Sequence, residues 1–363
     1  VGPLADDSPP PVAHDPITGA EVKALVTVLA SDEMAGREAG TPGEWAAAEL
    51  IIASLESLPR MQPAGDAGSW RQVFEIPEGS SVGGVDDLGP AHNVIAMLPG
   101  SDPDLADEVI VLGAHYDHVG KGTHGNSLFG AGLIHNGADD NASGSAVLLE
   151  LARSLATAPQ PPRRTLLFQW YSGEELGLLG SRHWVAQPTV PFERVVAMLN
   201  MDMVGRLTGS TLLVGGTGSS PVWPELLDAA LPGRELVVIQ DPPGAAPSDN
   251  SSFFVQDVPV LFFFTGLHED YHRPSDDVAR RPRGAGRGRR RVQARRPAPA
   301  RPQAAAGGAQ DHRRQALAAA PRGLAGLPRQ RAGRGRRVAR QLRAAQHRGR
   351  ARDPLSARGR GLR

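Results

Sequence analysis

Cysteine is absent from this sequence of 363 residues. Its absence excludes disulfide bonds, thiolate nucleophiles and zinc sites that use cysteine ligands. The compartment stays open, because a secreted protein can fold without disulfides. A reactive site in this chain must therefore be built from other side chains.

Long apolar runs are also missing. No run approaches the about 20 residues that a helix needs to cross a bilayer, so we expect no membrane span. The chain begins with Val1, and no basic-then-apolar leader precedes this residue. The proline-rich opening predicts a disordered start over residues 1–17. This pattern favours a secreted or periplasmic protein whose leader has been removed, and an incomplete sequence is the alternative.

The chain has no net charge, but its charges are unevenly distributed. Of the 39 basic residues, 26 lie after Asp277, together with only 2 of the 39 acidic residues. The part before this boundary is therefore strongly acidic, with a net charge near −24, and the part after it is near +24. An asymmetry this large predicts two regions of different character.

Residues 278–363 consist almost wholly of Arg, Ala, Gly, Pro, Gln and Leu, and they lack Lys, Ile, Met, Phe, Tyr and Trp. The abundant residues are those of GC-rich codons, which favours the interpretation of this tail as a shifted reading frame. It has too few large apolar side chains to offset its ordering entropy, so we expect it to be disordered. A genuine basic tail is the alternative. Nucleic-acid binding through its arginines would be supported by interleaved aromatic residues, but none follows Tyr271, and we expect no nucleic-acid partner.

Residues 18–277 are expected to form one catalytic domain of the α/β class. Continuous apolar runs predict strands, and stretches rich in helix formers or with apolar residues every four positions predict helices. Strands alternating with helices indicate a mostly parallel central sheet sandwiched between helices. The predicted strands are 93–98, 109–114, 165–170, 195–200, 211–214 and 258–264, and the predicted helical stretches are 18–58, 143–156 and 175–186.

Histidines and acidic residues follow several of these strands. In open α/β sheets, ligands bind beyond the carboxyl ends of the strands. Histidine nitrogen and carboxylate oxygen together suit zinc. Each residue alone could be polar loop surface, but chance would not place the whole set at one sheet edge. The set comprises His115, Asp117, Glu174, Glu175, Asp202 and His272.

These residues lie within a set of five separated segments. The segments are Gly113-Ala114-His115-Tyr116-Asp117-His118, Gly137-Ala138-Asp139-Asp140-Asn141-Ala142-Ser143-Gly144, Gly173-Glu174-Glu175-Leu176-Gly177, Asn200-Met201-Asp202-Met203 and Tyr271-His272-Arg273-Pro274-Ser275-Asp276. In their order and spacing these segments resemble the metal-site motifs of the M28 family of co-catalytic zinc peptidases. The resemblance covers roughly residues 20–277 and implies a zinc exopeptidase-like fold. It also implies an aminopeptidase that uses two Zn²⁺ ions and acts on peptides.

The resemblance also implies a role for each matching residue. His115 and Asp202 would bind one metal ion, Glu175 and His272 the other, and Asp140 would bridge both. Two further residues would support the chemistry. Asp117 would hold the His115 ring, since a ligating histidine usually donates its other N–H to a carboxylate. Glu174 would be the general base, and the alternative for it is an exposed loop glutamate.

Other residues near these motifs receive lesser roles. Asp139 is interpreted as structural, and the resemblance implies a strained turn at Asp140-Asn141 with a cis peptide bond. By analogy with the family, a pocket for the first substrate side chain would favour apolar residues and be lined by Met203, Phe262 and Phe264; the alternative is that the phenylalanines are core. The histidines interpreted as non-ligands are His118, His124, His135 and His268.

Other activities on the same fold remain open, namely glutaminyl cyclisation and carboxypeptidase action. Cyclases of this type use one metal ion, whereas the full set of five ligands favours two. The sequence does not indicate an oligomeric state.

Overall fold

The computed structural model describes residues 17–80, 88–124 and 126–278. The predicted disordered start therefore lies outside the described residues except for Ile17. The predicted tail lies outside them except for Val278. No helix in the described ranges is both long enough and apolar enough to cross a membrane.

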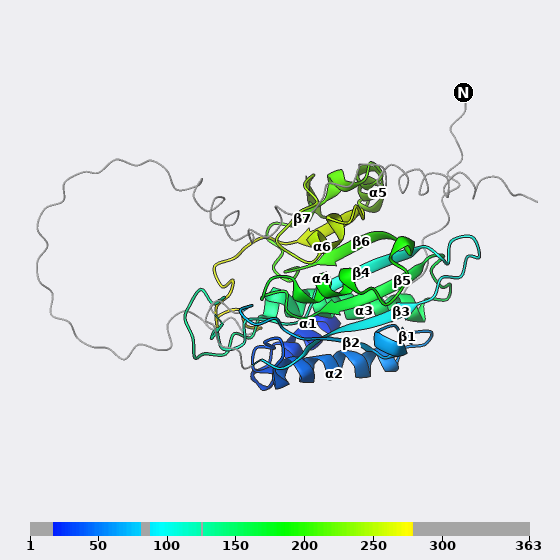
Figure 1. Cartoon of the computed structure of the whole chain (residues 1–363). Helices are drawn as coiled ribbons and strands as arrows, with labels where there is room; N and C mark the ends of the chain where they lie inside the picture. Colours follow the sequence, from blue (N-terminus) through cyan, green and yellow to red (C-terminus); the bar gives the residue numbers. More distant parts are fainter. Residues whose placement is uncertain (1–16, 81–87, 125, 279–363) are drawn as a thin grey trace, which may run out of the picture. The chain divides into compact units, whose positions relative to one another are not determined.

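Nine strands of the described chain form one mixed sheet (Figure 1). Its order is β1-β3-β5-β4-β6-β9-β7-β8, and β2 also pairs with β3. The central strands β5, β4, β6 and β9 are parallel to one another, and β3 and β7 flank them in antiparallel orientation. The strands are β1 (Gln62–Pro63), β2 (Arg71–Phe74), β3 (Ala91–Leu98), β4 (Val109–His115), β5 (Thr165–Tyr171), β6 (Val195–Met201), β7 (Thr211–Gly215), β8 (Val237–Asp241) and β9 (Val260–Phe264).

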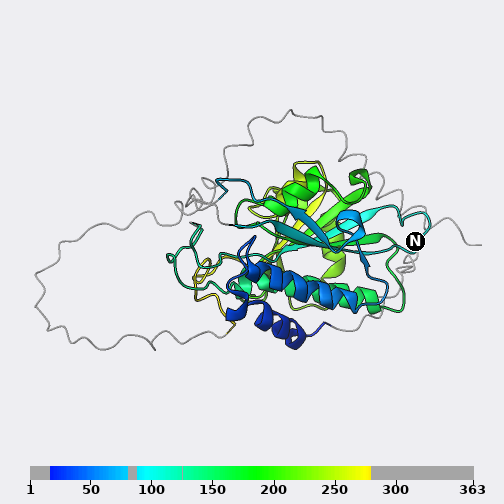
Figure 2. The same ribbon diagram turned by 60° about the horizontal axis from the view of Figure 1, so that its bottom comes forward.

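Helices cover both faces of the parallel core, as the sequence predicts. Helices α1 (Gly19–Leu29), α2 (Pro42–Glu56) and α3 (Gly144–Thr157) lie on one face, and Figure 2 shows α2 running alongside α3. Helices α4 (Leu179–Ala186) and α6 (Asn250–Phe254) contact each other on the opposite face. Because both faces are covered, all seven residues of β5 are buried.

Smaller elements complete the described structure. Helix α5 (Trp223–Ala230) packs its Trp223 near the β7 and β9 end of the sheet. The turn η3 leads into the start of α3 and has non-helical dihedral angles at Asp140 and Asn141. The short helical turns are η1 (Asp32–Met34), η2 (Asp66–Gly68), η3 (Ala138–Ser143), η4 (Phe192–Arg194) and η5 (Thr217–Ser219).

The predicted fold class is confirmed, and all six predicted strands are present with small shifts at their ends. The sequence missed the edge strands β1, β2 and β8 and the short helices α5 and α6. Strand β8 is mostly exposed and carries no continuous buried face, so its pattern is weak. The helix predicted over 175–186 begins only at Leu179, because a turn precedes it in which Gly177 and Leu178 have positive φ.

Candidate metal centre

The site lies where the parallel strands end. Strand β4 sits between β5 and β6, and the register pairs His115 with Tyr171 and Gly113 with Asn200. The carboxyl ends of these strands therefore reach the same edge of the sheet. His115 is the last residue of β4, Asp202 directly follows β6, and the adjacent glutamates follow β5.

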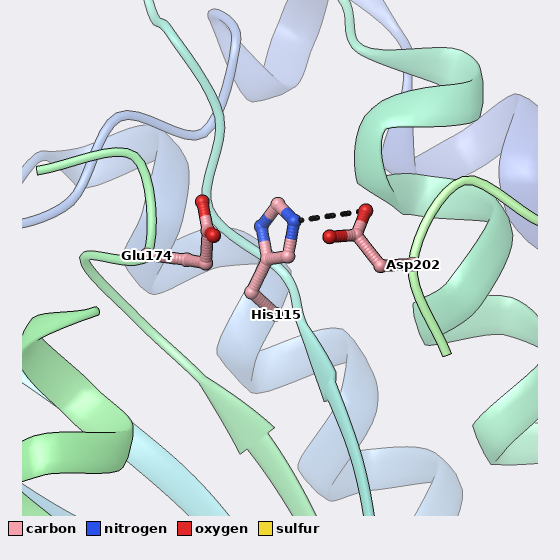
Figure 3. Close-up of side chains that lie close together, drawn as sticks. All are labelled: His115, Glu174 and Asp202. Carbon is pink, nitrogen blue, oxygen red and sulfur yellow. Dashed lines mark ion pairs between the residues drawn. The ribbon is translucent and has the colours of Figure 1, made fainter. Parts of the chain in front are cut away.

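One cluster, here called the strand-end group, consists of His115, Glu174 and Asp202. Their potential ligand atoms all lie within 4.8 Å of one another. Figure 3 shows the two carboxylates on either side of the imidazole ring, with Asp202 Oδ1 3.4 Å from His115 Nε2. His115 Nδ1 donates a hydrogen bond to the Asp117 carbonyl oxygen at 3.2 Å. Because a carbonyl oxygen only accepts, Nε2 is the nitrogen left to bind a cation.

A second cluster, the loop group, consists of His118, Glu175 and His272. His272 Nε2 lies 2.9 Å from Glu175 Oε2, and His118 Nδ1 lies 2.8 Å from Glu175 Oε1. His272 Nδ1 donates to the carbonyl oxygen of Asn126 at 2.7 Å, which again leaves Nε2 facing the carboxylates. The adjacent glutamates thus point into different groups.

Asp140 lies between the two groups. Its Oδ1 is 3.4 Å from His115 Nε2, and its Oδ2 is 3.2 Å from His272 Nε2. Each oxygen therefore faces the Nε2 atom of a different histidine. This is the arrangement that a carboxylate shared by two cations requires.

Asp276 holds the main chain on which Asp140 sits. Its buried carboxylate accepts hydrogen bonds from the Asp140 N–H at 3.0 Å, from the Asp139 N–H at 3.1 Å and from Arg206 at 2.7 Å. The peptide bond between Asp140 and Asn141 is cis, as predicted. The segment that supplies His272 therefore also anchors the backbone of Asp140.

The η3 turn is also joined to the loop after β6. The Asp139 carboxylate accepts the Gly205 N–H at 2.7 Å, consistent with the structural role expected for it, and the Asn141 side chain accepts the Met203 N–H at 3.1 Å. The Asp202 segment and the Asp140 segment are therefore held in one arrangement.

Asp117 contacts more than its predicted partner. Its carboxylate lies 3.6 Å from His115 Nδ1, so it faces the ring. The same carboxylate accepts the N–H of Glu174 at 3.2 Å and of Glu175 at 3.3 Å. Asp117 thus ties the loop after β4 to the loop after β5.

Negative charge is concentrated in this centre. Burial raises the pKa of the Glu174 carboxyl well above its ordinary value, and the charges of Glu175 and Asp202 add to the rise. Burial and the Glu175 charge likewise raise the pKa of Asp140. Burial disfavours the charged form of His272, but Glu175 and Asp140 outweigh this effect and raise its pKa to about 11. The cluster therefore favours any positive charge placed among these carboxylates, whether a proton or a metal ion.

Comparison with known proteins identifies the family. Residues 93–292 match the model of peptidase family M28. The chain belongs to this family. Among the relatives of this M28 chain, leucine aminopeptidase 1 of Trichophyton rubrum is 38% identical over 122 residues, which cover 32% of this chain and 30% of the relative.

A probable leucine aminopeptidase of Trichophyton verrucosum is 32% identical to the M28 chain over 196 residues. The aligned region covers 51% of each of the two chains. Leupeptin-inactivating enzyme 1 of Streptomyces exfoliatus is 36% identical over 115 residues, which are 31% of this chain and 23% of that enzyme. The M28 chain thus spans between about a quarter and a half of the length of these relatives.

Solved structures share the fold of the M28 chain. A zinc aminopeptidase from Bacillus subtilis has a TM-score of 0.51 at 18% identity, and a glutaminyl cyclase from Porphyromonas gingivalis has a TM-score of 0.55 at 22% identity. Each match covers 72% of this chain and 90% of the other. At these identities the likeness establishes the fold alone.

Three residues of the M28 chain were predicted to line a substrate pocket. Met203 and Phe262 are buried, and Phe264 is partly exposed. The rings of Phe262 and Phe264 stack with centroids 5.5 Å apart, so both lie on one face of β9. The pocket remains a prediction.

Sequence reasoning did not find several contacts of the M28 site. It interpreted His118 as a loop histidine, whereas the structure groups His118 with Asp140 and Glu175 as residues able to hold one ion. Its position directly after Asp117 is the available signal. It assigned no role to Arg206 or Asp276, although Asp276 lies within the quoted His272 motif. The hydrogen bond from His272 to Asn126 uses a main-chain carbonyl oxygen, so the type of residue at position 126 does not predict it.

Proposed function

We propose that this chain is a two-zinc aminopeptidase that removes residues from the free amino end of peptides. The observation that carries the proposal is the position of Asp140, whose two oxygens lie 3.4 Å and 3.2 Å from His115 Nε2 and His272 Nε2. Membership of peptidase family M28 supports a peptidase, and several relatives are named leucine aminopeptidases.

The donor atoms fit zinc. Tetrahedral ligands at about 2.0–2.1 Å from zinc lie about 3.3 Å from one another. The four separations that join His115 Nε2 or His272 Nε2 to the carboxylate oxygens of the other proposed ligands range from 2.9 to 3.4 Å. In addition, Asp202 Oδ1 is buried and accepts no hydrogen bond, so a cation would satisfy it. The proposed ligands are His115 and Asp202 for one ion, Glu175 and His272 for the other, and Asp140 for both.

Glu174 is the proposed general base. Two zinc ions bound here would polarise the peptide carbonyl and lower the pKa of a water. Glu174 accepts the proton of the attacking water and passes it to the leaving amine. Its main chain is fixed by the hydrogen bond to Asp117, and its carboxylate lies in the strand-end group rather than beside His272.

The free amino group and the first side chain of the substrate would define the specificity. The carboxylates of this site favour a cationic α-amine. Met203, Phe262 and Phe264 are the proposed contacts of an apolar first side chain, and the partial exposure of Phe264 leaves it accessible to a ligand. We therefore expect leucine and phenylalanine to be preferred at the amino end.

A panel of substrates tests this proposal. Aminoacyl-nitroanilides of Leu, Phe, Gly, Lys and Glu would be assayed with the purified full chain, before and after chelation and after zinc is returned. The zinc content of the active protein would be measured in parallel. Hydrolysis of the Leu and Phe substrates, lost with chelator and restored by zinc, is expected, with two zinc ions per chain.

The same experiment separates the alternatives. The fold is shared with a glutaminyl cyclase, so cyclisation of an amino-terminal glutamine peptide is included, as is a carboxypeptidase substrate. A chain that only cyclises glutamine, or that is active with one zinc ion, would show that the proposal is wrong.

Secretion or periplasmic export is also proposed, and cell fractionation of the source organism tests it.

A further inference from the structure

His118 is a fully buried imidazole beside the proposed ligands, and the mechanism above does not use it. The residue is 1% exposed, and its Nδ1 lies 2.8 Å from Glu175 Oε1. The other histidines of the same loop, His124 and His135, bond Glu38 and Ser127.

The backbone and ring of His118 are held in place. Its N–H donates to the Arg37 carbonyl oxygen at 3.1 Å. The ring packs directly on Gly137, where an added Cβ would lie 2.4 Å from the ring Cδ2 atom. Because real Cβ contacts are never this short, the glycine is required for the observed ring position.

The two oxygens of Glu175 have different partners. Oε2 faces His272 Nε2 at 2.9 Å, on the side of the proposed ion, whereas Oε1 faces His118. The distance from His118 Nδ1 to Asp140 Oδ2 is 3.9 Å, longer than the about 3.3 Å between tetrahedral zinc ligands. The separation from Glu175 Oε1 is that of a hydrogen bond, as is the 2.9 Å between Oε2 and His272 Nε2, so the longer distance to Asp140 is what distinguishes His118. His118 is therefore placed to bond the Glu175 oxygen that does not face His272.

We propose that His118 is a positioning residue that bonds Glu175 Oε1 and so presents only Oε2 to the ion of the loop group. The inference rests on the proposed two-metal site. Without this hydrogen bond the Glu175 carboxylate is free to rotate about its last side-chain bond, and the ion loses a preorganised ligand. Removing such an outer partner typically lowers metal affinity about 10–100-fold.

Matched variants test the hydrogen bond. In His118→Asn the side-chain amide places an N–H donor near the position of Nδ1, whereas His118→Phe keeps a ring of similar size without a donor. His135→Asn is the control, because His135 lies in the same loop and bonds the Leu133 carbonyl oxygen instead. The full-length proteins would be titrated with zinc against a chromophoric chelator, and the visible absorption of their Co²⁺ forms would be recorded. Circular dichroism of each metal-free protein would check that it folds.

The expected result is that His118→Phe lowers the affinity for one of the two zinc ions about 10–100-fold and leaves the affinity for the other unchanged. His118→Asn and His135→Asn should bind both ions nearly as the parent protein does, with the same Co²⁺ spectrum. Equal losses in the Asn and Phe variants, with an altered Co²⁺ spectrum, would identify His118 as a ligand and overturn the proposal, as would a folded Phe variant with unchanged affinity. All these readouts measure metal binding, so they stand even if the chain fails to cleave peptides.

Discussion

The strand-end group and the loop group differ in what holds them. His115 is the last residue of β4, and Asp202 directly follows β6, so the register of neighbouring parallel strands places both. His272 instead lies in the loop that follows β9, and its ring is held by the carbonyl oxygen of Asn126 from another loop. Glu175 depends in the same way on His118. One half of the centre is thus built by the sheet, and the other by hydrogen bonds between loops.

The two groups also differ in the roles proposed for their residues. In the strand-end group, His115 and Asp202 lie at the ends of hydrogen-bonded strands, and Glu174, the proposed base, is held beside them by the bond from its N–H to Asp117. The loop group contributes ligands whose positions depend on more contacts, each of which a single substitution removes. We therefore expect the loop group to be the more sensitive to changes outside the ligands themselves.

The largest expected effect distinguishes the two adjacent glutamates. Glu174→Gln should lower kcat about 10²–10⁴-fold, the usual contribution of general acid–base catalysis, while both zinc ions stay bound. Glu175→Gln should lose the ion of the loop group. Steady-state kinetics and elemental analysis of the same preparations measure both effects. Near-normal turnover in the Glu174 variant would assign the base to another group.

Ligand substitutions sharpen the comparison further. His115→Gln and His272→Gln should each abolish tight binding of one ion. Asp140→Asn should lower the affinity for both ions, because the two Asp140 oxygens face both groups. Zinc titration by calorimetry gives the number of tight sites in each variant. If Asp140→Asn removed one ion only, Asp140 would not be a bridging ligand.

Asp276 tests the hydrogen bonds behind the ligands. Asp276→Asn removes the carboxylate that accepts the N–H groups of Asp139 and Asp140, and we expect zinc affinity to fall about 10–100-fold. Asp270→Asn is the matched control, because Asp270 also pairs with Arg206, at 2.6 Å, but accepts its other hydrogen bond from Ser275 and not from the amides of the η3 turn. Equal losses in competition titrations of the two variants would instead show that the Arg206 ion pairs are what matters.

The smallest expected effect concerns the dynamics of the two groups. Zinc should slow amide hydrogen exchange more in residues 126–133 and 265–276 than in β4, β5 and β6, whose amides are already in the sheet. Exchange measured by mass spectrometry with and without zinc makes the comparison. Equal protection of strands and loops would remove the distinction between a sheet-built and a loop-built half.

The sequence alone determined the parallel core and the residues at its edge. Continuous apolar runs predict β4, β5, β6 and β9, because strands buried on both faces need apolar side chains throughout. Parallel strands end at one edge, so His115 and Asp202 were expected to meet there. The M28 motifs added Asp140, its cis peptide bond and the assignment of His272 to the second ion.

Only the tertiary structure decided how these residues are held. His118 and Glu175 are 57 positions apart, and Asp140 and Asp276 are 136 positions apart. The paths of the loops that bring them together follow no periodicity of 2 or 3.6 residues, so no sequence pattern encodes them. The late start of α4 follows from the turn before it, in which Gly177 and Leu178 have positive φ, whereas the residue composition of 175–186 favours a helix throughout. Local apolar spacing determines strands, whereas polar contacts between distant loops form only once the sheet has placed those loops side by side.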